Sequence, residues 1–183
     1  MEHYVDIRIL PDAEMRENVL LNKVYSKFHK ALCDLDANDI GVSFPEYRVK
    51  LGSLMRIHGS KQRIEALQAL HWLGGLSGYC KVGDILPVPS ATKYRVISRI
   101  QSNMTEAKLR RLMKRGSMTA EEARAYKAKM FAQGMDNPYL ELESSSNGHK
   151  HRRYIQFGEL LDSYTEGEFD QFGLSKAASI PWF

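Results

Sequence analysis

The residues of this chain that could do chemistry are histidines and serines that lie outside any metal or nucleotide motif. The six histidines do not share the spacing of a known metal-ligand pattern, although His149 and His151 lie two apart on a predicted strand edge. A basic turn that faces a nucleic acid is the simpler interpretation of that G-H-K-H-R-R stretch. The sequence has no phosphate-binding P-loop, nucleophile elbow or dinucleotide fingerprint. Metal-dependent and nucleotide-driven reactions are therefore disfavoured.

RNA cleavage is a reaction that requires neither group, because the 2′-OH of RNA can attack the adjacent phosphate. The protein must then supply a base that works near neutral pH, a group that fixes the ribose, and positive charge. A histidine at the edge of a buried helix, with a serine from a neighbouring loop, fits this need. His29 lies at the border of a predicted apolar helix stripe. Taken alone, such a histidine is more often a packing or surface residue, and its spacing to other residues does not change that.

Positive charge is concentrated in one short stretch of the chain. Residues 93–115 contain one acidic residue, Glu106, and eight basic residues: Lys93, Arg95, Arg99, Lys108, Arg110, Arg111, Lys114 and Arg115. Within this stretch, residues 105–115 predict a helix that Thr105 caps and Gly116 ends. Its apolar residues share one face and its cations the other. Solvated faces usually mix both signs, so we expect a docking face for a polyanion; a merely solvated face is the alternative.

Composition indicates a folded chain with a real core. The 183 residues are 43% hydrophobic and carry a formal net charge of +4. Cys33 and Cys80 are too few for a disulfide framework, so we expect reduced thiols in a cytoplasmic protein. The N-terminus lacks a signal-peptide pattern, and no apolar run approaches the roughly 20 residues that cross a bilayer.

The first ninety residues predict the element order β-α-β-β-α-β, which is the ferredoxin-like pattern. The predicted elements are a strand over 3–10, a helix of about twenty residues after P-D-A-E, strands over 40–44 and 54–58, a helix over 61–72, and an extended segment over 79–88. In the second helix, we expect Ile64, Leu67, Leu70 and Trp72 to point inward. This fold hosts many functions, so the pattern alone does not select one.

Two prolines in P-V-P-S-A-T-K, residues 87–93, predict a linker and a domain boundary near residue 90. The expected fold class is α+β, with a ferredoxin-like domain over 1–90 and a smaller α+β domain over 91–183. The second domain begins with a strand over 94–101, whose Arg95, Arg99 and Gln101 share one face. After the basic helix come a helix from Thr119 to about Ala132 and a hairpin whose turn contains Asn147-Gly148.

Several stretches, in order along the whole chain, resemble one family. They are H-Y-V-D-I-R, K-F-H-K-A-L around His29, I-G-V-S-F-P, R-I-H-G-S, Y-R-V-I-S-R-I-Q, L-R-R-L-M-K-R, T-A-E-E-A-R and the terminal G-L-S-K-A-A-S-I-P-W-F. The family is that of the CRISPR-associated endoribonucleases that process precursor CRISPR RNA in the subtype I-F (Ypest) system.

The resemblance implies a ferredoxin-like domain that carries the catalytic histidine and a smaller domain that recognises an RNA hairpin. It implies binding to the stem-loop of CRISPR repeats and cleavage at the 3′ base of the stem. The resemblance further implies that the 2′-OH attacks without a metal or other cofactor and that the product ends in a 2′,3′-cyclic phosphate. It also implies that the protein then stays on the CRISPR RNA with the other subunits of a type I-F surveillance complex.

The resemblance also implies roles for individual residues. His29 resembles the general base, and Ser144 resembles the serine that holds the attacking ribose, with Ser145 and Ser146 as adjacent alternatives. Arg99 and Gln101 resemble the pair that reads bases at the foot of the stem. The residues that resemble the basic helix in the RNA major groove, with Arg111 as base reader, are Lys108, Arg110, Arg111, Lys114 and Arg115.

Three positions depart from the family pattern. His151 stands where the family has an aromatic ring that stacks on the closing base pair, Phe172 replaces an active-site tyrosine, and Lys114 replaces an arginine. Lysine keeps a phosphate contact but loses bidentate recognition. The missing hydroxyl at Phe172 keeps open a non-catalytic RNA-hairpin-binding subunit of a ribonucleoprotein. A DNA-binding regulator that uses the basic helix is a third, weaker hypothesis.

Overall fold

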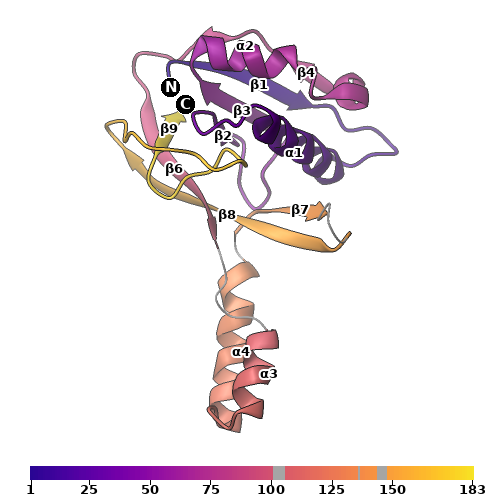
Figure 1. Cartoon of the computed structure of the whole chain (residues 1–183), viewed down its shortest axis with the longest axis vertical. Coiled ribbons are helices and arrows are strands. Elements are labelled where there is room, and N and C mark those ends of the chain that lie inside the picture. The colour runs from indigo at the N-terminus through magenta and orange to yellow at the C-terminus, as the bar shows by residue number, and fades with distance from the viewer. Residues whose placement is uncertain (101–105, 136, 144–147) are drawn as a thin grey trace. The chain divides into compact units, whose positions relative to one another are not determined.

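The first half of the chain forms an antiparallel sheet with helices packed on it, as a computed structural model shows (Figure 1). Its elements are β1 (His3–Ile9), α1 (Glu17–Asp34), β2 (Gly41–Ser43), β3 (Leu54–Gly59), α2 (Lys61–Ala69), a 3-10 helix η1 (Gly74–Tyr79), β4 (Cys80–Val82) and β5 (Leu86–Pro87). The strand order is β2-β3-β1-β4, and β5 also pairs with β1. This order and the β-α-β-β-α-β sequence confirm the predicted ferredoxin-like arrangement.

The structure describes residues 1–100, 106–135, 137–143 and 148–183. They fall into two compact units, Met1–Arg99 with Pro138–Phe183, and Ile100–Asn137. The predicted functional division, with a boundary near residue 90, stays a prediction.

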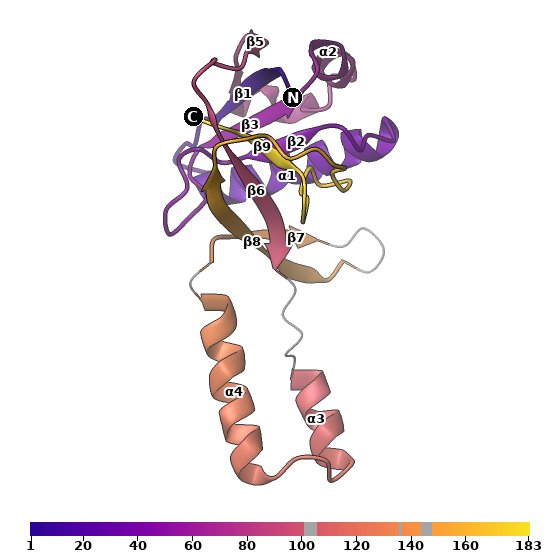
Figure 2. The same cartoon turned by 90° about the vertical axis from the view of Figure 1, so that its left-hand side faces the viewer.

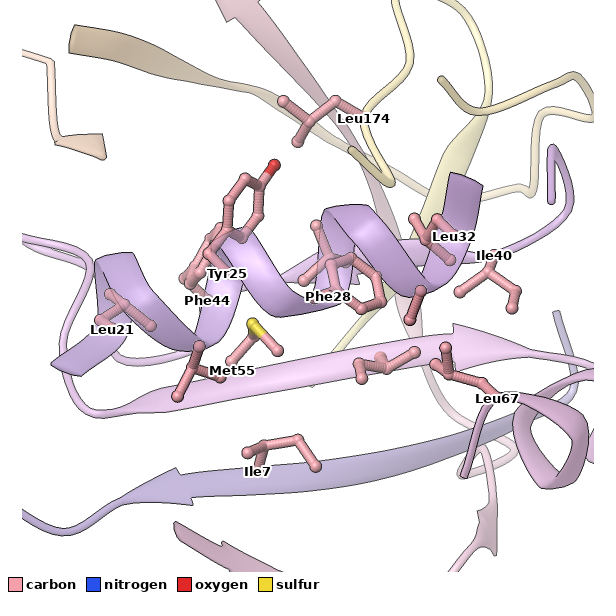
Figure 3. Close-up of a cluster of buried hydrophobic side chains, with 14 of the residues drawn as sticks. Ile7, Leu21, Tyr25, Phe28, Leu32, Ile40, Phe44, Met55, Leu67 and Leu174 are labelled. Atoms are coloured by element: carbon pink, nitrogen blue, oxygen red, sulfur yellow. The ribbon is translucent and has the colours of Figure 1, made fainter. Parts of the chain in front are cut away.

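The core of the first unit lies between its sheet and α1. The pairing of β1 with β3 places Val5 opposite Ile57 and Ile7 opposite Met55, and all four side chains are buried. The apolar stripe of α1 packs on them because its residues recur at helical spacing: Leu20, Leu21, Val24, Tyr25, Phe28, Ala31 and Leu32. Figure 3 shows side chains of α1, β1, β3 and the C-terminal segment in one cluster.

The same unit contains a second antiparallel sheet, and this sheet shares that core. Its strands are β6 (Lys93–Ile100), β7 (Tyr139–Glu143), β8 (Lys150–Leu161) and β9 (Ser179–Trp182), in the order β7-β8-β6-β9 (Figure 2). Ile97, Leu140, Ile155 and Ile180 are buried in the cluster that also holds Val5. The two sheets are therefore stabilised by burial of common apolar surface.

The C-terminal segment lies directly against β2. A side chain at Gly41 would come within 2.7 Å of Ile180 Cγ2, so only glycine permits this approach. Beside it, the Val42 amide donates a 3.0 Å hydrogen bond to the carbonyl of Gly173. This packing brings residues from the end of the chain to the surface of α1.

The second unit contains α3 (Glu106–Lys114) and α4 (Ala120–Met135), which run side by side (Figure 2). Gly116, at φ 67°, ends α3: its amide bonds the Met113 carbonyl and the Ser117 amide bonds the Leu112 carbonyl, as in a Schellman motif. The predicted capping box starts α4, because Thr119 N–H donates to Glu122 Oε2 at 2.7 Å and Glu122 N–H donates to Thr119 Oγ1 at 3.2 Å.

Two details differ from the sequence-based expectation. The second helix ends at Ala69, and Leu70, expected to point inward, is 43% exposed because the chain leaves helical geometry there. The extended segment over 79–88 is divided between β4 and β5. Within the described part of the chain, no helix combines the length and the apolarity that spanning a membrane requires.

Candidate active site

His29 lies on α1 next to the buried Phe28, and its own side chain is half-buried. Phe28 belongs to the apolar stripe, so the next position along the helix turns toward the edge of the core. This confirms the border position that the helical spacing predicts.

One ring nitrogen of His29 is fixed by the C-terminal segment. His29 Nδ1 lies 2.6 Å from the backbone carbonyl oxygen of Gln171. A carbonyl oxygen can only accept, so Nδ1 carries the proton and donates this hydrogen bond. In the neutral ring, Nε2 therefore keeps its lone pair and can accept a proton.

The turn that presents Gln171 is stabilised by Asp170. The Asp170 carboxylate accepts hydrogen bonds from the amides of Phe172 at 2.9 Å and Leu174 at 3.0 Å. Gly173 adopts a φ of 71°, which glycine does at little cost. The sequence D-Q-F-G-L thus forms a tight turn for local reasons, with aspartate at its start and glycine at its left-handed position.

Phe172 stacks between the His29 ring and the Arg153 guanidinium group. The His29 and Phe172 rings are 3.7 Å apart and inclined by 7°, and Arg153 Cζ lies 3.4 Å from the Phe172 ring centroid. Both groups cannot occupy one face at these distances, so they lie on opposite faces. Arg153 comes from β8 and is 5% exposed. The stack holds the plane of His29 and places a buried cation behind it.

Cys33 and the Gln171 side chain complete the surroundings of His29. Cys33 Sγ lies 3.7 Å from His29 Nδ1 and 3.9 Å from Nε2, and donates to Gln171 Oε1 at 3.3 Å. Burial, with the charge of Asp34, raises the pKa of the Cys33 thiol. The thiol therefore stays protonated at neutral pH and can act as a donor.

A cavity of about 610 Å³ opens at His29. Its walls come from α1, the strand pair β7–β8 and the C-terminal turn, and include Cys33, Glu143, His151 and Phe172. The structure therefore brings His29 and His151, which are 122 positions apart in the sequence, to one cavity.

The other predicted site residues are distributed as follows. Arg99 is half-buried on β6 and close enough to Arg153 to lower the pKa of that guanidinium, in addition to the larger effect of burial. The basic side chains of α3 and the following turn are exposed: Lys108, Arg110, Arg111, Lys114 and Arg115. Gln101, Ser144, Ser145 and Ser146 lie outside the described residues.

Two other arrangements bear on the chemistry. Among the residues that the structure describes, no three histidine, cysteine, aspartate or glutamate side chains gather as a metal-ligand set. Ser43 Oγ and His58 Nε2 are 2.8 Å apart, but both side chains are almost wholly buried. Burial lowers the pKa of His58 to about 3, so this pair is a neutral part of the core.

The family model for CRISPR-associated protein (Cas_Csy4) matches residues 4–183. This chain belongs to that family. The Csy4-family proteins named "CRISPR-associated endonuclease Cas6/Csy4" from Escherichia coli (strain UTI89 / UPEC) and Pseudomonas aeruginosa (strain UCBPP-PA14) are each 40% identical to it, over 100% of both chains. A solved structure of the CRISPR endoribonuclease Cse3 bound to a 19-nucleotide RNA covers 99% of this chain and 100% of its own, at 12% identity and a TM-score of 0.38.

Sequence reasoning missed several residues around His29 in this Csy4-family chain. Cys33 was recognisable in principle, because positions four apart on a helix are neighbours. Gln171 and Arg153 had no such signal, since they reach His29 and Phe172 only through tertiary packing.

Proposed function

We propose that this protein is an endoribonuclease that processes precursor CRISPR RNA. It binds the stem-loop of the repeat, cleaves at the 3′ base of the stem and stays bound to the product. Family membership and the names of the two full-length relatives support this reaction class. The observation that carries the proposal is the geometry of His29, whose Nδ1 donates to Gln171 and whose Nε2 is left as an acceptor.

The proposed reaction needs no metal. His29 Nε2 takes the proton of the 2′-OH, the 2′-oxygen forms a bond to phosphorus, and the bond from phosphorus to the 5′-oxygen breaks. The leaving 5′-oxygen takes up a proton, and the other product ends in a 2′,3′-cyclic phosphate. The stack of Phe172 and Arg153 fixes the imidazole plane in this step.

Substrate positioning is assigned to residues around the cavity and on α3. Ser144, which directly follows the cavity residue Glu143, orients the ribose; Ser145 or Ser146 is the alternative. Arg99 and Gln101 read bases at the foot of the stem, and His151 stacks on its closing pair. The proposed major-groove contacts come from Lys108, Arg110, Arg111, Lys114 and Arg115. The A-form groove is normally too narrow for side chains, but a short hairpin opens it near the loop.

The test is cleavage of a repeat hairpin by His29→Ala protein in the presence of EDTA. The wild-type protein is expected to cut with chelator present, and the variant is expected to lose cutting while it still binds the hairpin. His71→Asn is a matched control, because His71 is exposed and its φ of 47° suits asparagine. Full cleavage by the His29 variant, or a requirement for Mg²⁺, contradicts the proposal.

A non-catalytic hairpin-binding subunit is the second candidate, and Phe172 is the observation that favours it. A phenylalanine there has no hydroxyl to contribute to the reaction. If the wild-type protein binds the repeat hairpin and never cuts it, this candidate replaces the first. Equal affinity for a matched DNA hairpin would instead favour the DNA-binding regulator.

A further inference from the structure

A second cavity, of about 500 Å³, lies along α1 beside the candidate active site. Its walls come from α1, η1, β7 and β8. In Figure 1, α1 and β7 lie side by side, and the Glu141 amide donates to Asn22 Oδ1 at 3.0 Å. This cavity is therefore formed within one unit of the protein.

The second cavity adjoins the cavity at His29. Ser26, Lys30 and Glu143 line both of them. A chain molecule that leaves the His29 cavity along these shared residues therefore meets the second cavity.

The surface of the second cavity carries four lysines, which we call the lysine track: Lys23, Lys27, Lys30 and Lys150. All four are exposed. The three on α1 have the spacing i, i+4, i+7, which places them on one face of the helix. Their steps along the axis are about 6 and 4.5 Å, comparable to the distance between neighbouring phosphates on one strand.

Little negative charge opposes the lysine track. Within the described ranges, none of its four lysines forms an ion pair, although Glu143 lies opposite Lys150 in the β7–β8 pairing. Lys23 Nζ donates to the sulfur of Met15 at 3.6 Å. Of the two carboxylates in the cavity, Glu141 lies 3.7 Å from Arg152 Nε. The cavity thus has a net positive charge and attracts an anion.

We infer that the lysine track binds the single-stranded RNA that continues 3′ of the scissile bond. Proteins bind single-stranded nucleic acid in positively charged grooves that follow its backbone, and a row of lysines along one helix face provides such a groove. The inference rests on the proposed function, in which the scissile bond lies at His29 with the stem on its 5′ side. The strand that continues from that bond away from the stem is then the 3′ flank.

The experiment compares the affinity of two repeat hairpins that carry a 2′-deoxynucleotide before the scissile bond, so that neither is cleaved. One ends just after that bond, and the other continues for about ten nucleotides. Wild-type protein is expected to bind the extended RNA more tightly. The slope of log affinity against log salt concentration is expected to be steeper for the extended RNA than for the short RNA by about two units. Each of three additional phosphate contacts contributes about 0.7 to this slope.

The variant replaces three lysines that do not line the His29 cavity: Lys23→Gln, Lys27→Gln and Lys150→Gln. Its gain from the 3′ extension, taken as the affinity ratio of extended to short RNA, is expected to disappear. The charge-matched control replaces three exposed lysines outside both cavities: Lys50→Gln, Lys61→Gln and Lys81→Gln. The control is expected to keep the full gain.

Three outcomes overturn the inference: no gain in the wild-type protein, an undiminished gain in the track variant, or an equal gain from a 5′ extension of the same length. Cleavage of the unmodified short hairpin is measured in the same series. If the wild-type protein cuts that hairpin but shows no gain, the lysine track fails and the proposed function stands. If the hairpin is bound and not cut, the proposed function itself fails.

Discussion

The spacing of His29 to other residues does not mark it as catalytic, and its chemical character depends on contacts from far along the chain. The carbonyl that fixes its Nδ1 belongs to Gln171, which is 142 positions away. The ring that stacks on it belongs to Phe172. Its tautomer and orientation are therefore properties of the folded chain.

His58 is the histidine whose titration should affect folding. Its side chain is fully buried, and burial, with smaller effects of Arg56 and the N-terminus, lowers its pKa from 6.5 to about 3. Between these values, the unfolded chain binds a proton that the folded chain does not. The effect of His58 on the free energy of unfolding is therefore constant above pH 6.5. Between pH 6.5 and about pH 3, this free energy falls by about 1.4 kcal/mol for each unit by which the pH decreases.

Urea unfolding of the wild-type protein and His58→Gln between pH 7 and pH 5 measures this effect. The variant lacks the titrating group and does not lose this stability. The difference in unfolding free energy by which the wild-type protein exceeds the variant should therefore shrink by about 2 kcal/mol as the pH falls from 7 to 5. Background titration of carboxylates is common to both proteins and cancels in the difference. Parallel stability curves would show that His58 does not carry the effect.

The α3 helix combines strong local signals with a one-sided charge distribution. Gly116 ends it in a left-handed conformation, and Leu109 is 2% exposed on its apolar face. The cations on the other face follow directly from 3.6-residue periodicity. Such a helix keeps its two faces distinct without help from residues far along the chain.

We predict that two substitutions on α3 have different effects on hairpin binding. Lys114→Gln should reduce the slope of log affinity against log salt by about one unit, with little change in sequence preference. Arg111→Lys should cost about 1 to 3 kcal/mol of discrimination among stem sequences, because lysine cannot make a bidentate base contact. Affinities for a panel of stems at several salt concentrations measure both quantities.

Lys81→Gln is the charge-matched control for these variants, since Lys81 lies on the exposed surface of β4. An Arg111 variant with the stem preferences of the wild-type protein would refute its role as base reader. A salt slope that Lys114→Gln leaves unchanged would refute its phosphate contact.

For the molecule as a whole, the C-terminal segment connects the second sheet to the ferredoxin-like core and to His29. Gly173 bonds to β2 through the Val42 amide, and Ile180 and Phe169 pack over Gly41. The turn that carries Gln171 and Phe172 lies within this segment. The position of the candidate base is thus coupled to the packing of the last fifteen residues or so.

Gly41→Ala tests this coupling. An added Cβ would lie 2.7 Å from Ile180 Cγ2 and 2.9 Å from Phe169 Cε1, so we expect a loss of about 1 to 3 kcal/mol in unfolding free energy. Hairpin cleavage should slow as well, because the displaced segment carries the contacts of His29. Urea unfolding and single-turnover cleavage measure the two effects.

Gly75→Ala provides the matched control, since no atom lies within 4 Å of a Cβ at that position. A Gly41 variant as stable and as active as the Gly75 variant would show that the segment is not held by this close approach.

The sequence by itself determined the features that depend on local periodicity and turn chemistry. The ferredoxin-like order, the border position of His29, the capping box at Thr119 and the end of α3 at Gly116 all follow from spacing between near neighbours. Leu70 was placed wrongly because the end of a helix is the least determined part of a periodic pattern.

Only the tertiary structure decided that both sheets share one core, that Gln171 holds the His29 ring and that Arg153 lies behind Phe172. It also decided that Lys150 joins the lysines of α1 along one cavity. Most of these contacts join residues far apart in the sequence, such as His29 and Gln171, which are 142 positions apart. Local backbone preferences cannot specify them, because they arise from the burial of apolar surface that distant segments share.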